Sequence, residues 1–179
     1  THLDNAPAFV NVYAKSIRAF RSFLVALNIK RGGVSYPRVV KWSTEASYGN
    51  QPISWLESDA TLDAGEYELS DTPGNIIDGL PLGDSFIIYK DDSIYIMNYV
   101  GTPYIFSFKL LSPTIGLLAK NAVAEYEGGH CWLPSEIISA IRHGKYNKKI
   151  DGNGKIHYQS SEFGERKWRS DPKDGLRPM

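Results

Sequence analysis

A run of short apolar segments separated by turn residues dominates residues 39–116 of this chain. The segments include Val39–Trp42, Ile76–Leu80 and Ser85–Lys90, and Pro, Gly, Asn and Asp gather between them. Apolar runs of strand length that are bounded by such residues predict β-strands joined by hairpins. We therefore expect a mainly β fold of antiparallel strands with tight hairpins.

The clearest hairpin is predicted to pair Ser85–Lys90 with Ser93–Tyr99 across a turn at Asp91-Asp92. Aspartate tolerates the left-handed conformation that such turns use. Both arms carry apolar residues at successive positions, so both faces of this hairpin are expected to be covered. The next strand is expected at Tyr104–Leu111, where aromatic and apolar residues recur at every second position and share one face.

Other strands are expected at Phe23–Ile29, Gly65–Leu69, Asn121–Tyr126 and His130–Leu133. The stretch Tyr13–Phe20 is interpreted as a strand, with a helix as the alternative, because periodicity does not decide a short apolar run. Between the strands, Ser43–Asp63 is rich in Ser, Asp, Gly and Asn. It predicts a long irregular connection, and Trp55 is expected to pin it to the body of the fold.

Regular strand spacing is compatible with part of a β-propeller or with a β-sandwich or barrel. A propeller blade has about four strands, so the chain has room for about two blades and not for a closed ring. We expect a β-rich domain over residues 1–133. A short helix is expected over 134–144, capped by Ser135 and ended by Gly144. The polar residues 145–179 are expected to be poorly ordered or held by a partner.

The charges of the chain balance, with 20 Lys plus Arg against 20 Asp plus Glu. Tight nucleic-acid binding needs many cationic contacts to phosphate, so a neutral chain argues against it, although not against a wall that DNA only passes. Lys15, Arg18 and Arg21 lie close together near aromatic residues. They are the candidates to face DNA, and an ordinary solvated surface is the alternative.

Cysteine content and hydropathy exclude several protein classes. Cys131 is the only cysteine, so no intramolecular disulfide can form. No apolar run approaches the roughly 20 residues that a membrane-spanning helix needs, and no membrane insertion is expected. The first residues do not resemble a signal peptide. Because the sequence starts at Thr1 and not at a methionine, we expect a fragment, a processed product or a trimmed chain.

The sequence offers little for catalysis. His130 and Cys131 are adjacent, and adjacent strand residues point to opposite faces, so they cannot act as a base and a nucleophile together. Cys131 is expected to be a buried structural residue. Asp91 and Asp92 are interpreted as a solvated turn, and neither metal-ligand spacing nor a phosphate-binding glycine motif is present. We expect no enzyme activity, no cofactor and no metal.

The tract from about Phe23 to His130 resembles the tail nozzle proteins of short-tailed phages, the tail tubular protein B family. It covers a little more than half of the chain. The residues that carry the resemblance are Phe23–Asn28, Trp42-Ser43, Ser54-Trp55, Ala64-Gly65 with Leu69, Leu80–Asp84, Ile88–Tyr95, Phe106–Phe108, Gly116 and Glu127–His130. Each motif is short, and their order and spacing are more specific than any one of them.

The resemblance implies a virion structural protein built around a β-propeller with additional β domains. It implies a hexameric ring below the head–tail adaptor, in the virion tail, that contacts other tail proteins and forms part of the channel through which DNA leaves. It carries no catalytic residues. This chain departs from the family in being several times shorter and in lacking the expected strands after Leu133.

The leading hypothesis is therefore a nozzle-like structural component of a phage tail. The aromatic residues expected in its core or at its interfaces are Trp42, Trp55, Tyr48, Phe86, Tyr95, Phe106 and Phe108. The alternative is a β-rich binding module that recognises carbohydrate or a receptor through Trp55, Tyr48 and the polar connection around them. A hydrolase that uses Cys131 or His130 ranks last, because no third group is evident to orient the pair.

Overall fold

The computed structural model describes residues 12–59, 61–126 and 128–135 in full, and the backbone of three strands within residues 147–170. The fold is mainly β, as predicted, and its strands form three antiparallel sheets. Among the described residues there is no helix. The helix expected over 134–144 lies outside the described residues from position 136 onward, and Pro134 and Ser135 form a bridge and a turn.

The first sheet contains four strands in chain order. They are β1 (Val12–Phe20), β2 (Phe23–Arg31), β3 (Val34–Trp42) and β4 (Gly65–Glu68). β1 pairs with β2 along its whole length, which confirms the strand at 13–20 and rules out the helical alternative. Two glycines with positive φ, Gly32 and Gly33, turn β2 into β3.

The second sheet also follows chain order. Its strands are β5 (Ile76–Leu82), β6 (Ser85–Lys90), β7 (Ile94–Tyr99) and β8 (Phe106–Ser112). The predicted hairpin is confirmed as β6 and β7, with Tyr89 opposite Ile94. β6 is buried from Phe86 to Lys90, so both of its faces are covered, as expected.

The third sheet has five strands, again in chain order. They are β9 (Val123–Tyr126), β10 (Gly129–Trp132), β11 (Asn147–Asp151), β12 (Ile156–Gln159) and β13 (Trp168–Ser170). This sheet continues past the domain boundary expected at residue 133, and three of its strands lie within the stretch 145–179. The sequence did not reveal them because β11 begins with three polar residues, Asn147 to Lys149, and lacks an apolar alternation.

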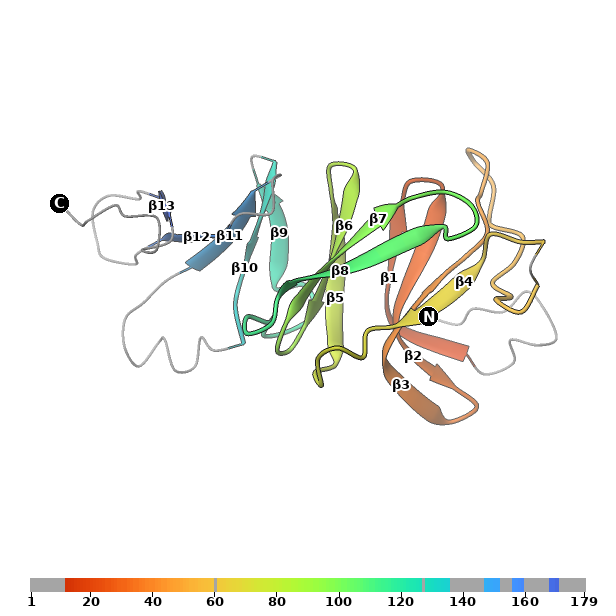
Figure 1. The fold of residues 1–179 in the computed structure, drawn as a ribbon, viewed down its shortest axis with the longest axis horizontal. Helices are drawn as coiled ribbons and strands as arrows, with labels where there is room; N and C mark the ends of the chain where they lie inside the picture. Colours follow the sequence, from red (N-terminus) through yellow and green to blue (C-terminus); the bar gives the residue numbers. More distant parts are fainter. Residues whose placement is uncertain are drawn as a thin grey trace.

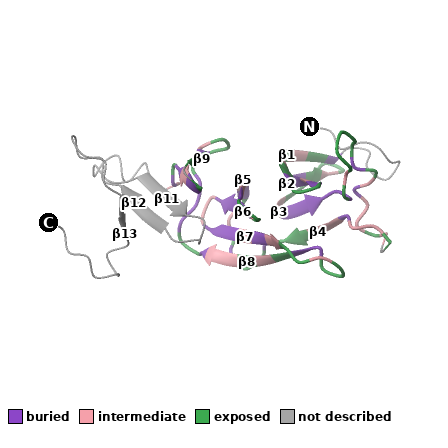
Figure 2. Ribbon diagram, turned by 90° about the horizontal axis from the view of Figure 1, so that it is seen from above, coloured by how far each residue is buried: buried purple, intermediate pink, exposed green. Residues whose placement is uncertain are grey.

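The three sheets lie side by side along the long axis of the molecule (Figure 1). β5, the first strand of the second sheet, contacts β1 of the first sheet and β9 of the third. Buried residues concentrate between neighbouring sheets, whereas β4 and β8 are largely half-buried or exposed (Figure 2). Adjacent sheets therefore share their cores, and the outer strands border solvent.

Two apolar clusters join the sheets. The cluster between the first two sheets includes Phe20, Phe23, Leu27, Val40, Trp42, Phe86, Ile88, Tyr95, Met97 and Phe106. The cluster between the second and third sheets includes Leu82, Ile87, Tyr89, Ile94, Ile115, Leu117, Val123 and Trp132. Each face of the central β6 strand contributes to one cluster, which explains why the sequence of this strand is apolar at successive positions.

The irregular connection between β3 and β4 covers the other face of the first sheet. Trp55 from this connection is buried in a third cluster with Val12, Ala26 and Ile29. Burying a tryptophan removes a large apolar area from water. The ring of Trp55 thus attaches the connection to the sheet.

The turn at Asp91-Asp92 is not the solvated tip that the sequence predicted. Both residues are half-buried, and their carboxylates accept backbone hydrogen bonds from a neighbouring segment. The Gly74 N–H donates to Asp92 Oδ2 at 2.8 Å, and the Asn75 N–H donates to Asp91 Oδ1 at 2.9 Å. The aspartates therefore connect the β6–β7 turn to the chain that enters β5.

Candidate binding groove

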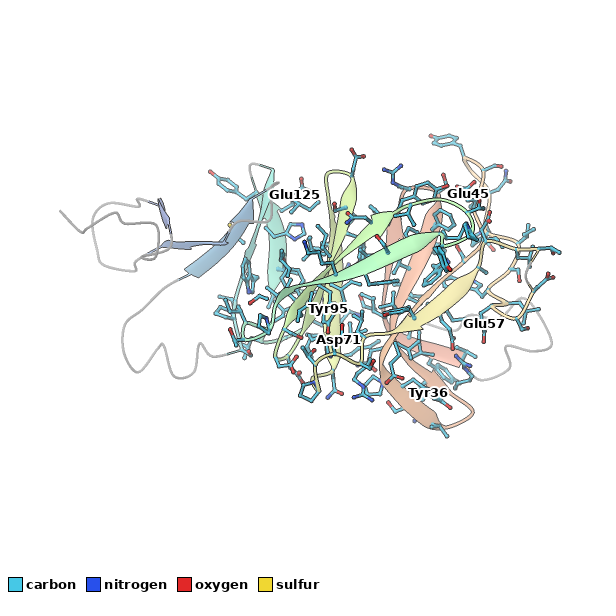
Figure 3. The ribbon with its side chains drawn as sticks, viewed as in Figure 1. Tyr36, Glu45, Glu57, Asp71, Tyr95 and Glu125 are labelled. Atoms are coloured by element: carbon cyan, nitrogen blue, oxygen red, sulfur yellow. The ribbon has the colours of Figure 1, made fainter. Side chains whose placement is uncertain are left out.

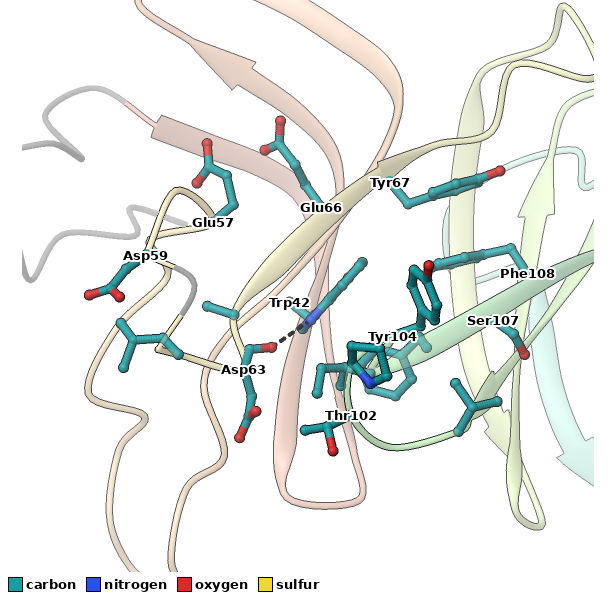
Figure 4. A pocket seen from close by; sticks show the side chains of 16 residues that line it. Trp42, Glu57, Asp59, Asp63, Glu66, Tyr67, Thr102, Tyr104, Ser107 and Phe108 are labelled. Atoms are coloured by element: carbon teal, nitrogen blue, oxygen red, sulfur yellow. Dashed lines mark hydrogen bonds between the residues drawn. The ribbon is translucent and has the colours of Figure 1, made fainter.

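A groove of about 860 Å³ opens where the first and second sheets meet at their outer strands. One wall comes from residues 57–67, at the end of the long connection and the start of β4. The other wall comes from residues 100–108, in the β7–β8 loop and β8, and Trp42 lies between the walls (Figure 4). The groove is thus built by segments that are distant in sequence.

Aromatic rings form the base of this groove. Tyr67 stacks on Phe108 with centroids 4.6 Å apart and an interplanar angle of 5°. Trp42 meets Phe106 edge to face at 5.3 Å, and its Nε1–H donates to the backbone oxygen of Asp63 at 2.9 Å. Tyr104 is 77% exposed at the rim. The floor is held in place by ring contacts, and Tyr104 remains available to a ligand.

The charged side chains that line the groove are all carboxylates: Glu57, Asp59, Asp63 and Glu66. No Lys, Arg or His is among its described lining residues. Behind the wall, the buried Lys41 ammonium binds Glu57 and also Glu66, at 3.3 Å. Lining of one sign favours cationic or neutral ligands over anionic ones.

Two of these carboxylates have altered pKa values. Burial by itself would raise the pKa of Glu57, but hydrogen bonds and the nearby charges of Lys41 and Arg31 outweigh it and hold the pKa below its usual value. Hydrogen bonds from Thr61 lower the pKa of Asp59. Glu57 lies on the connection beside the first sheet (Figure 3). Both groups are ionised at neutral pH; the charge of Glu57 is balanced by Lys41 and Arg31, and Asp59 adds negative charge to the groove.

The groove is bordered by two sheet edges, because β4 and β8 each end the strand order of their sheet. The Leu69 N–H donates to Arg38 O, so by alternation the backbone groups of Glu66 point away from β3. The Val100 N–H donates to Ile105 O, so the backbone groups of Ile105 point toward β7. By the same alternation, the backbone groups of Phe106 and Phe108 point away from β7. Outward-pointing backbone groups are available for pairing with another extended chain.

The aromatic residues singled out from sequence occupy different environments. Trp42, Trp55, Phe86, Tyr95 and Phe106 are buried, Phe108 is half-buried and Tyr48 is fully exposed. Because Trp55 is buried in an apolar cluster, it cannot form a ligand-binding platform with Tyr48. Among the residues that line the groove, the exposed aromatic side chains are Tyr67 and Tyr104, which sequence reasoning missed.

The three candidate DNA-facing cations do not share one role. Lys15 is exposed on β1. Arg18 donates to Asp78 through Nη2 at 2.6 Å and through Nε at 3.1 Å. Arg21 lies over the Tyr99 ring at 5.1 Å and 3.3 Å from Asp84. Arg18 is therefore bound to a buried carboxylate and keeps only part of its side chain in contact with solvent.

Asp78 connects all three sheets. Its side chain is fully buried on β5 and accepts hydrogen bonds from Ser16 and Arg18 of β1 and from the Asn121 N–H that precedes β9. Burial alone would raise the pKa of Asp78, but the hydrogen bonds from Arg18, Ser16, Asn121 and Gly79 outweigh it and lower the pKa. The carboxylate is thus ionised at neutral pH, at the point where the first strands of the three sheets meet.

His130 connects the second and third sheets. Its Nε2 lies 2.8 Å from the Pro81 carbonyl, which can only accept, so Nε2 carries a proton. In the neutral ring Nδ1 then accepts from the Tyr89 hydroxyl at 2.9 Å. Cys131, the next residue, was expected to be buried but is half-buried. These contacts assign His130 to the packing of the sheets.

Stability should respond to pH through His130. Burial lowers its pKa, against smaller opposing effects of the Pro81 carbonyl and Glu125. The unfolded chain therefore binds a proton at higher pH than the folded chain, and the free energy of unfolding should fall as pH decreases below about 6.5. The slope contributed by one proton is at most about 1.4 kcal/mol per pH unit. Urea denaturation of wild type between pH 7 and pH 5 measures it.

The matched variant for this measurement is His130→Gln, which retains polar atoms but does not titrate. Its unfolding free energy should vary less with pH over the same range, whatever its value at pH 7. An unchanged pH dependence in the variant would show that another group is responsible.

Lys90 is a further buried group that sequence reasoning missed. Its ammonium donates to the Leu69 carbonyl at 3.1 Å and to the Thr72 carbonyl at 2.6 Å, and it lies 5.6 Å from the Tyr95 ring centre. Burial lowers the pKa of Lys90. Tyr95 and Asp71 lie at the same end of the second sheet (Figure 3). The contact of Lys90 with Leu69 and Thr72 could not be predicted, because a lysine within an apolar strand does not indicate which carbonyl groups it will meet.

Within the described residues, no group of three or more His, Cys, Asp or Glu side chains could hold a metal ion. In the same part of the chain there is no helix of the length and apolarity that crossing a membrane requires. Comparison with known proteins found neither a family model nor a curated protein that matches this sequence.

Proposed function

We propose that this chain is a structural module of a phage tail nozzle, in which its three sheets act as consecutive blades of a β-propeller. The observation that carries the proposal is the strand order. Each sheet is a meander in chain order, and β5, the first strand of the second sheet, contacts the first strands of both neighbouring sheets. Propeller blades are typically sheets of four strands arranged radially around a channel; the first two sheets have this number, and the third has one strand more.

The contacts between the sheets support this proposal. In a propeller, each blade packs face to face on the next, and here apolar clusters fill both spaces between adjacent sheets. Asp78 on β5 accepts hydrogen bonds from Ser16 of β1 and from the Asn121 N–H, which lies two residues before β9. The resemblance of residues 23–130 to tail nozzle proteins supplies the biological setting, a virion tail in which DNA passes the ring.

Propellers have about four to eight blades, so the three sheets of this chain account for part of one propeller. Rings of identical chains form when a heterologous interface closes by rotation. We propose a hexameric assembly that contacts the head–tail adaptor and other tail proteins. Its role is structural and not catalytic.

Native mass spectrometry of the purified chain over a range of concentrations tests the assembly. We expect a discrete species of six copies of the 20.0 kDa chain that dissociates on dilution. Electron microscopy of the same sample should show rings. A chain that stays monomeric at the highest concentration would contradict assembly through this module.

A further inference from the structure

The groove between β4 and β8 has the charge, the rings and the backbone edges that suit one class of occupant. We propose that it binds an extended, basic segment of a partner polypeptide, with a lysine or arginine side chain between Asp63 and the ring of Tyr104. The charge and shape of the groove do not depend on the tail assignment.

Charge selects a cationic partner. Glu57 and Glu66 are bound by cations of the same chain, but no ion pair involves Asp59 or Asp63 among the described residues. Trp42 Nε1 holds the backbone of Asp63 in place, which limits the movement of its carboxylate. A guanidinium or ammonium placed there would gain a charge-assisted hydrogen bond, whereas an anionic ligand would be repelled.

The exposed rings favour the same kind of side chain. Tyr104 is 77% exposed and Tyr67 is 48% exposed, although one face of Tyr67 already stacks on Phe108. A cation over the face of such a ring is attracted to it, and the methylene groups of lysine or arginine cover apolar surface. Carboxylates on one wall and a tyrosine on the other (Figure 4) can therefore contact a single long basic side chain.

The strand edges select a polypeptide over a small cation or a sugar. β4 and β8 are both edge strands, and the outward backbone groups of the half-buried Glu66 and Phe108 border the groove. An extended segment can pair its backbone with such an edge while alternate side chains enter pockets. Neither a free amine nor an oligosaccharide would use these backbone groups in this way.

Fluorescence anisotropy with the full chain tests the proposal. The probe is a labelled peptide of about ten residues that alternates lysine with valine, and its counterpart carries glutamate in place of lysine. We expect the lysine peptide to bind and the glutamate peptide not to bind. Raising NaCl from about 50 mM to about 500 mM should weaken the binding at least about fivefold.

Matched variants locate the site. Tyr104→Ala and Asp63→Asn should each weaken binding of the lysine peptide at least about fivefold. Tyr48→Ala and Asp84→Asn make the same chemical changes at exposed residues outside the groove and should leave binding unchanged. Circular dichroism would establish that all four variants stay folded. Equal affinity of the Asp63 and Asp84 variants would overturn the proposal.

A peptide that is N-methylated at alternate residues tests the backbone contact, because it keeps its charge but loses donors on one edge. Loss of its binding supports an extended strand, and unchanged binding overturns that part of the proposal. A neutral oligosaccharide such as cellohexaose is the competing ligand. Binding of the sugar that depends on Tyr104, without binding of the lysine peptide, would replace the proposal with a carbohydrate site.

Discussion

Replacing Asp78 with alanine should lower the free energy of unfolding by about 3–5 kcal/mol. The carboxylate is fully buried and accepts hydrogen bonds from Ser16, Arg18, Gly79 and Asn121. Its removal leaves the Arg18 guanidinium without its buried partner and leaves the Asn121 N–H without its acceptor. Because these donors come from more than one sheet, the variant should also unfold less cooperatively. Urea denaturation followed by circular dichroism measures both effects.

Asp84→Ala is the matched control, since the Asp84 side chain is 99% exposed and its loss should change stability by no more than about 0.5 kcal/mol. Acid provides a second test. The pKa of Asp78 is lowered by folding, so its contribution is present above the ordinary value of 3.8 and is lost as pH falls below it. The Asp78 variant should therefore lose less stability than wild type on acidification to about pH 3. Equal losses would assign acid sensitivity to other carboxylates.

Gly116→Ala should destabilise the protein by about 3 kcal/mol or more, because a methyl group there has no room. A Cβ at Gly116 would lie 2.1 Å from the Asp91 carbonyl oxygen and 2.6 Å from the Asp92 nitrogen. This backbone cannot yield easily, since Leu117 N donates to Lys90 O at 2.8 Å and Asp91 is bound to Asn75. Thermal denaturation should show a large decrease in melting temperature.

Gly83→Ala separates steric overlap from backbone strain. Gly83 has a φ of +56°, and a Cβ at this position would have nothing within 4 Å, so the substitution should cost only about 1–2 kcal/mol for the left-handed conformation. Gly116→Ala should therefore be the more destabilising of the two. If the Gly83 variant were equally or more destabilised, the packing of residue 116 against the β6–β7 turn would not explain the loss of stability in the Gly116 variant.

Local patterns were sufficient to predict much of the fold. The β6–β7 hairpin, β2 and β8 were predicted because apolar residues at strand length are bounded by turn residues, and this signal does not depend on distant parts of the chain. The same reasoning left β1 open between strand and helix, and pairing with β2 decided it. β11 to β13 were missed because they are short and contain few apolar residues, and pairing with β10 places β11 in the sheet.

The groove could not be predicted, because its walls are about forty residues apart in sequence and meet only through the packing of two sheets. In the sequence, nothing distinguishes Tyr67 and Tyr104 from other strand and loop tyrosines. They become groove residues because Tyr67 stacks on Phe108 and because the 100–108 segment faces the 57–67 segment. Arg18 looked like a surface cation for the same reason, since the sequence does not show that Asp78 of the next sheet lies beside it.

The sequence alone determined the mainly β character of this protein, its tight hairpins and the apolar faces of its central strands, because turn chemistry and side-chain alternation act between neighbours in the chain. Only the tertiary structure decided which polar groups became buried contacts and which aromatic rings stayed exposed. Asp78, His130 and Lys90 are held by partners on distant segments. A buried charge is tolerated only where several donors or acceptors converge, and that convergence is a property of the packed sheets.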